Sequence, residues 1–167
     1  MLSKLITRSA ASAFLLALAP FLAVAQSDAR KTFDQLKALE GNWEGKNAQG
    51  MPLKVSFRMT ADGSALMSEI QGHGQENMVT MFHMDGDRVL ATHYCSAGNQ
   101  PRMKAITSDG KSVTFDFVDG TNLTPGAGHM QRLTLTQADA DHHTEEWIFQ
   151  APGKEMREVF SLSRAGN

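Results

Sequence analysis

Apolar and polar residues alternate in short runs along most of the chain after Gly41. In residues 53–59, apolar side chains occupy every second position and polar side chains stand between them. The same alternation recurs in residues 113–117. A period of two is typical of a strand that buries one face and exposes the other. The pattern therefore predicts a series of half-buried β-strands.

Turn signals separate these runs at regular intervals. Asp62-Gly63, Asp85-Gly86 and Asp109-Gly110 indicate tight hairpins, because glycine supplies the positive φ that such turns need. Looser, glycine-rich or polar breaks lie at residues 47–50, 72–77, 96–100, 119–128, 138–141 and 152–153. The runs number about ten, at the spacing of an all-β sandwich or barrel. No helical crossover separates them, which favours an antiparallel meander.

The first strand of an even-numbered meander can pair with the last, which removes both exposed edges. Ahead of the strands, Phe33, Leu36 and Leu39 recur every three residues, as on a short amphipathic helix over residues 32–39. We therefore expect an all-β fold, a single antiparallel up-and-down barrel of about ten strands preceded by a short N-terminal helix.

The loops of such a meander fall into two sets, one at each end of the barrel. The tight turns gather at one end, together with residues 138–141. The longer loops, including residues 96–100 and 119–128, gather at the other. Binding residues usually lie on longer loops over a rigid scaffold. The loop-rich end is therefore the predicted binding end.

Chemically capable side chains are concentrated near that end. His93 and Cys95 share the parity of the apolar positions 89 and 91, and His129 and Gln131 share that of positions 133 and 135, so all four are expected to point inward. The facing of Arg102 depends on whether the turn at residues 108–110 has two or three residues. The predicted ligand-binding residues are His93, Tyr94, Cys95, Asn99, Arg102, His129 and Gln131. For the histidines, a hydrogen-bonded role within the barrel wall is the alternative.

Residues 1–25 have the features of a cleaved secretory signal. Lys4 and Arg8 precede an apolar run, and the segment ends in Ala23-Val24-Ala25, the small-x-small pattern of a signal peptidase site. The run is shorter than a membrane-spanning helix requires. We expect cleavage after Ala25, export to the periplasm or medium, and one domain over residues 26–167 without an integral membrane segment.

Charge and cysteine content narrow the functional classes. The first 25 residues hold two of the 16 basic residues and none of the 18 acidic ones, which leaves 14 basic and 18 acidic residues, a net charge of about −4. No basic patch indicates a nucleic-acid partner. Cys95 is the only cysteine, so no internal disulfide forms. The oligomeric state is not specified by these features.

Gly41-Asn42-Trp43 after a short helix, and Arg164 near the end of the last strand, resemble the signature of the calycin superfamily. In lipocalins and fatty-acid-binding proteins, an arginine from the last strand covers a tryptophan on the first. Segments including residues 80–83, 92–95 and 98–103 further resemble an uncharacterised family of bacterial exported lipocalin-like domains. This resemblance implies a calycin-like barrel and no particular activity. Ten strands also suit haem-binding nitrobindin-like barrels.

Three functional hypotheses follow. The first is an exported barrel that binds a mostly apolar small molecule, with an anionic group if Arg102 points inward. The second is haem binding with His93 or His129 as the iron ligand. Haem is an alternative here, since the primary prediction includes no cofactor. The third is an enzyme that uses His93, Cys95 or an inward carboxylate, Glu145 or Glu158, in acid/base or thiol chemistry. Adjacent His142 and His143 should point to opposite faces, so no metal site is expected there.

Overall fold

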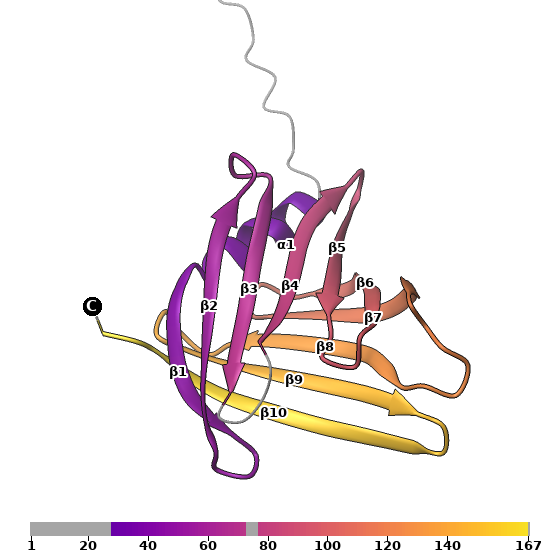
Figure 1. The fold of residues 1–167 in the computed structure, drawn as a ribbon. Coiled ribbons are helices and arrows are strands. Elements are labelled where there is room, and N and C mark those ends of the chain that lie inside the picture. Colours follow the sequence, from indigo (N-terminus) through magenta and orange to yellow (C-terminus); the bar gives the residue numbers. More distant parts are fainter. Residues whose placement is uncertain (1–27, 73–76, 167) are drawn as a thin grey trace, which may run out of the picture.

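The computed structural model describes residues 28–72 and 77–166. The predicted signal peptide, residues 1–25, lies outside the described residues. Ten antiparallel strands form one closed barrel in which each strand pairs with its sequence neighbours, so the predicted fold class is confirmed (Figure 1). The elements are α1 (Asp28–Lys37), β1 (Gly41–Asn47), β2 (Pro52–Thr60), β3 (Ala65–Gly72), β4 (Met78–Asp85), β5 (Arg88–Tyr94), β6 (Gln100–Ser108), β7 (Ser112–Thr121), β8 (His129–Gln137), β9 (His142–Ala151) and β10 (Lys154–Arg164).

The barrel closes between β1 and β10, as the even strand number predicts. Trp43 pairs with Arg164 at one end of this seam, and Asn47 pairs with Phe160 at the other. A Cβ atom at Gly45 would lie 1.9 Å from the carbonyl oxygen of Ser161. Only glycine allows the two backbones to approach so closely here, and this position therefore supports closure.

The β2–β3 hairpin has the predicted facing. Met59 lies opposite Leu66 and Val55 opposite Ile70, so the apolar sides of both strands meet inside the barrel. The turn spans residues 61–64, and Ala61, Asp62 and Gly63 all have positive φ. The register is the one that a turn centred on Asp62-Gly63 requires. The last paired residues are Thr60 and Ala65, so the turn has four residues instead of two.

The β6–β7 hairpin has the predicted facing but a different register. Met103 lies opposite Phe117 and Ala105 opposite Phe115, with two register shifts along the pair. Residues 109–111 join the two strands in place of the predicted 108–110, and the carboxylate of Asp109 accepts hydrogen bonds from the backbone N–H groups of Lys111 and Ser112. A sequence pattern of period two does not reveal such shifts.

Helix α1 covers the tight-turn end of the barrel (Figure 1). Ala29, Phe33 and Leu36 are buried and join the barrel core, and the helix contacts β4 and β5. The helix starts four residues before the predicted position and ends two residues earlier. No helix among the described residues is both long enough and apolar enough to span a bilayer. Because α1 covers this end, we expect a ligand to enter the barrel from the loop-rich end.

Candidate functional site

A pocket of about 620 Å³ lies at the loop-rich end of the barrel. Its walls come from the starts of β4, β8 and β10, the ends of β3, β5 and β9, and the loop after β5. Most of the lining side chains are apolar or contain sulfur. The lining residues are Ile70, Met78, His93, Cys95, Ser96, Ala97, Met130, Trp147, Phe149, Met156, Glu158 and Phe160. The predicted binding end therefore contains a cavity.

His93 supplies one polar atom to this pocket. It lies on β5 opposite Thr80 of β4, and its side chain is fully buried. Its Nδ1 lies 2.9 Å from Thr80 Oγ1, whereas its Nε2 has no hydrogen-bond partner among the described residues. The imidazole packs on Trp147, with 4.8 Å between ring centroids. Burial lowers the pKa of His93 to about 4, so the ring is neutral at physiological pH.

Glu158 supplies a second polar atom. It lies on β10 opposite Trp147 and lines the pocket. Its Oε1 is buried, and within the described part of the chain no donor contacts it. The described lining residues include no lysine or arginine. The pocket thus combines an unpaired carboxylate oxygen and an unpaired imidazole nitrogen with apolar walls.

Cys95 and Asn99 occupy the two ends of the loop after β5. Cys95 lines the pocket, as its inward parity predicts. Asn99 is buried but does not line the pocket; its side-chain amide donates a 2.8 Å hydrogen bond to the carbonyl oxygen of Gly128. The backbone N–H of Cys95 donates to the carbonyl oxygen of Asn99, which closes the loop. Asn99 therefore connects two loops at this end, a structural role that the sequence did not indicate.

Tyr94 and Arg102 lie on the outer surface of the barrel. Tyr94 is 49% exposed, and Arg102 forms a bidentate ion pair with Asp119 of β7, with 2.7 Å between Nη2 and Oδ2. The hydrogen bond from Arg102 lowers the pKa of Asp119. The prediction that these two side chains line the open end is wrong. Successive residues of a strand point to opposite faces, and inward His93 and Met103 leave only the outer face for their neighbours.

His129 and Gln131, which are predicted to point inward at the binding end, are not among the residues that line this pocket. The β8–β9 register shifts between Met130 and Arg132, so Gln131 is an extra residue in the strand. Met130 lines the pocket in place of the histidine. The His129 ring packs on Phe117, with 4.3 Å between centroids, and Nε2 lies 3.3 Å from Gln131 Oε1. A single-residue bulge reverses the facing of a strand beyond it.

A buried polar cluster lies deeper in the barrel, toward the helix-covered end. Glu145 accepts a 2.9 Å hydrogen bond from Trp147 Nε1, and its other oxygen lies 3.3 Å from His143 Nε2. Both Glu145 and His143 are 1% exposed. His142 is exposed beside Asp139, so the adjacent histidines face opposite sides as predicted. Among the described residues, no group of three or more His, Cys, Asp or Glu side chains is arranged to hold a metal ion.

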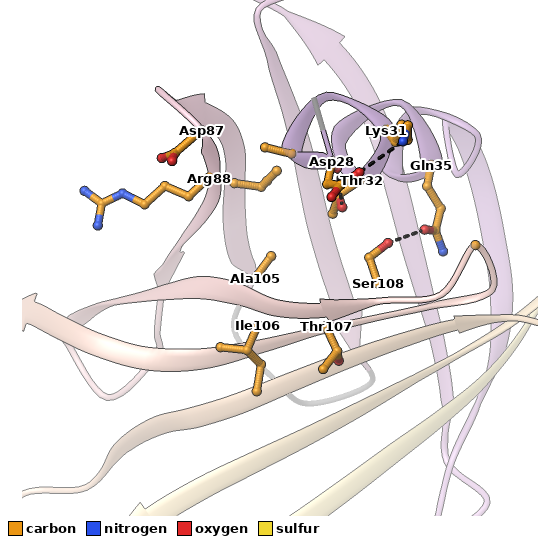
Figure 2. Close-up of a pocket in the computed structure, with 13 residues that line it drawn as sticks. Asp28, Lys31, Thr32, Gln35, Asp87, Arg88, Ala105, Ile106, Thr107 and Ser108 are labelled. Carbon is orange, nitrogen blue, oxygen red and sulfur yellow. Dashed lines mark hydrogen bonds and ion pairs between the residues drawn. The ribbon is translucent and has the colours of Figure 1, made fainter. Parts of the chain in front are cut away.

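A second pocket, of about 440 Å³, lies between α1 and strands β5 and β6 (Figure 2). Several of its polar groups already have partners. Ser108 donates a 2.9 Å hydrogen bond to Gln35, and Lys31 lies 3.0 Å from Asp28. Figure 2 shows Arg88 extending away from the helix. We therefore assign the candidate site to the loop-rich end, where buried polar atoms lack partners.

The tryptophan and arginine that carry the calycin resemblance lie in contact. The Arg164 guanidinium carbon lies 4.2 Å from the Trp43 ring centroid, and its nitrogens donate to the carbonyl oxygens of Glu40 and Ala38. A Cβ at Gly41 would lie 2.6 Å from Arg164 Nη1, so this glycine leaves room for the guanidinium. No protein-family model matches the chain, and a search of curated proteins found no match.

Proposed function

We propose that this protein is an exported barrel that binds a mostly apolar small molecule in the pocket at its loop-rich end. One observation carries the proposal: His93 Nε2 and Glu158 Oε1 are buried beside the same pocket without hydrogen-bond partners among the described residues. A buried polar atom left unpaired costs about 1–3 kcal/mol. A ligand that pairs with both atoms would recover this free energy on binding.

The dimensions and walls of the pocket support this function. Ligand pockets commonly have volumes of roughly 300–1,000 Å³, apolar walls and a few polar groups. The pocket here has about 620 Å³ and is walled by side chains such as Trp147, Phe149 and Phe160. Three methionines add flexible, polarisable surface that adapts to irregular ligands.

The charges at the pocket favour a neutral or cationic ligand over an anionic one. Glu158 places a carboxylate at the cavity, while Arg102 is paired with Asp119 outside it. An anionic group would face Glu158 without a compensating cation. A hydroxyl, amine or ammonium group would instead donate a hydrogen bond to the carboxylate. We therefore propose an apolar ligand that carries a hydrogen-bond donor, instead of the anionic ligand that the sequence suggested.

A displacement experiment tests this proposal. The protein is loaded with a neutral, environment-sensitive fluorescent probe, and long-chain alkylammonium and long-chain carboxylate ions of equal length compete for the site. We expect the alkylammonium to displace the probe at lower concentration. Glu158→Gln should reduce its advantage by about tenfold or more, since a hydrogen bond to a charged group contributes about 1.5–3 kcal/mol.

The exposed Glu155 on the same strand provides the matched control, because Glu155→Gln removes one charge without touching the pocket. Absence of saturable probe binding would contradict a ligand-binding function. Stronger displacement by the carboxylate would contradict the proposed ligand class.

Export is part of the proposal and is supported by the sequence of residues 1–25. Amino-terminal sequencing of the protein from its own source should find Gln26 as the first residue. Retention of Met1 would contradict cleavage.

Haem is a second candidate ligand, favoured by His93. Its Nδ1 is held by Thr80, and its free Nε2 adjoins the pocket, as an axial iron ligand requires. The carboxylate of Glu158 and the lack of a basic residue among the described lining residues disfavour the haem propionates. Addition of haemin should produce a shifted Soret band that His93→Gln abolishes; an unchanged spectrum would remove this candidate.

A further inference from the structure

The sulfur atoms in the wall of this pocket are potential metal donors as well as apolar surface. The only cysteine of the chain and three methionines line it together with the buried His93. Thiolate, thioether and imidazole are the ligands that soft transition-metal ions prefer, and Cu(I) in particular. Five candidate donor side chains therefore border one cavity, and three of them lie on β4, on β5 and at the start of the loop after β5.

Strand register places Met78, His93 and Cys95 together. His93 lies directly opposite Thr80 in the antiparallel β4–β5 pair. Met78 precedes Thr80 by two residues, so Met78 and His93 project from the same inner face of the pair. Cys95 follows His93 by two residues, one residue beyond the end of β5. All three line the pocket.

The expected separations suit a shared metal ion. Side chains that lie opposite each other on antiparallel strands have Cβ atoms about 4.5–5.5 Å apart, and diagonal neighbours about 7–8 Å. Val79 and Tyr94 are the last paired residues at this end; Met78 and Cys95 are the next residues on either side, and His93 is diagonal to Met78. Ser96 Oγ lies 3.7 Å from Met78 Sδ, so the thioether does reach toward the Cys95 end of β5.

His93 has the features of a metal ligand. Its Nδ1 lies within hydrogen-bond distance of Thr80 Oγ1, and this contact orients the ring. Its Nε2 is buried and has no partner in the described part of the chain.

We propose that Met78, His93 and Cys95 form a binding site for a soft monovalent metal ion of the Cu(I) class. On binding, the Cys95 thiol loses its proton to solvent and the thiolate sulfur bonds to the ion, whose oxidation state does not change. Met78 and His93 bind through lone pairs without proton loss. The set contains no carboxylate, so hard cations such as Mg²⁺ and Ca²⁺ are disfavoured. The site uses the β4–β5 wall, whereas the proposed charge selectivity for organic ligands depends on Glu158 of β10.

Anaerobic titration of the purified protein with Cu(I), in competition with a chromophoric chelator, tests the site. We expect one equivalent to bind. Loss of a residue that only orients a metal ligand already weakens metal binding by about 10–100-fold, so Met78→Leu and Cys95→Ser should each weaken it by at least about tenfold. Met78→Leu keeps the volume and apolarity of the wall, which separates loss of sulfur from loss of packing.

Met51→Leu is the matched control, because Met51 is 42% exposed and lies outside this pocket. X-ray absorption of the copper-loaded protein should show both sulfur and nitrogen neighbours, with one sulfur lost in Met78→Leu. The proposal is overturned if Cu(I) does not bind, if Met78→Leu and Met51→Leu bind it equally, or if Zn²⁺ displaces it. None of these outcomes bears on the proposed organic ligand, because the displacement test of that ligand depends on Glu158, which these variants leave unchanged.

Discussion

Trp147 donates a 2.9 Å hydrogen bond from its indole Nε1 to Oε2 of Glu145. The same indole lines the pocket and packs on His93. Glu145 in turn contacts His143, whose ring meets Trp43 edge-on at 4.2 Å between centroids. A continuous series of contacts thus connects the pocket to the end of the barrel that α1 covers. Trp147 both lines the pocket and begins this series.

The first prediction concerns this hydrogen bond. Trp147→Phe keeps an aromatic ring against His93 but removes the only indole donor to a carboxylate that is 1% exposed. We expect the free energy of unfolding to fall by about 1–3 kcal/mol, because a buried carboxyl oxygen loses its hydrogen-bond donor. Denaturant-induced unfolding measures this loss.

A double-mutant cycle separates the hydrogen bond from packing. Glu145→Gln should make the Trp147→Phe change less costly, since a neutral amide tolerates the lost donor better than a carboxylate does. Additive effects of the two changes would mean that Trp147 stabilises the barrel through packing alone.

The second prediction concerns Arg164. Arg164→Ala removes a guanidinium that lies over the Trp43 ring and donates to three backbone carbonyl groups. We expect a loss of about 1–3 kcal/mol of unfolding free energy. The control is Arg157→Ala on the same strand, which breaks a surface ion pair with Glu146 and should cost no more than about 1 kcal/mol. Equal losses in thermal or denaturant unfolding would argue against a special role for Arg164.

The third prediction is the pH dependence of stability. The pKa of His93 falls from 6.5 to about 4 on folding, because burial disfavours the imidazolium. Between these values the unfolded chain binds more protons than the folded one, so stability rises with pH. The contribution is fully present above about pH 6.5 and is lost as the pH falls toward 4, on the order of 3 kcal/mol in all.

Unfolding free energies measured from pH 7 to pH 4 test this dependence. His93→Gln, whose side chain does not titrate, should show a shallower decline than the unmodified protein. His129→Gln, at a histidine outside the pocket, serves as the control. An identical decline in the His93→Gln variant would show that His93 does not produce the acid sensitivity.

The fourth prediction concerns the glycine behind the pocket wall. A Cβ atom at Gly128 would lie 2.1 Å from Cε1 of Phe149, a lining residue of the pocket. Gly128→Ala should therefore displace the Phe149 ring, destabilise the protein by about 1–3 kcal/mol and weaken probe binding. Unfolding and probe titration check both effects. The double variant with Phe149→Leu should recover stability, and failure to do so would place the clash elsewhere.

The sequence by itself determined the fold class. Period-two alternation, turn residues and an even number of strands predict a closed meander, and the inward facing of His93 and Cys95 follows from the same alternation. These features are local, since each depends on neighbouring residues within one strand or turn. The loop-rich end could be predicted for the same reason, because loop lengths are visible along the chain.

The tertiary structure alone decided which side chains meet. With an extra residue at Gln131, Met130 rather than His129 lines the pocket, and two register shifts and the turn at residues 109–111 set the β6–β7 pairing. The convergence of His93 and Glu158 on one cavity joins residues 65 positions apart, from strands β5 and β10. Bulges depend on how neighbouring strands twist and pair, and proximity across a barrel depends on closure, so neither has a signal in the local pattern of residues.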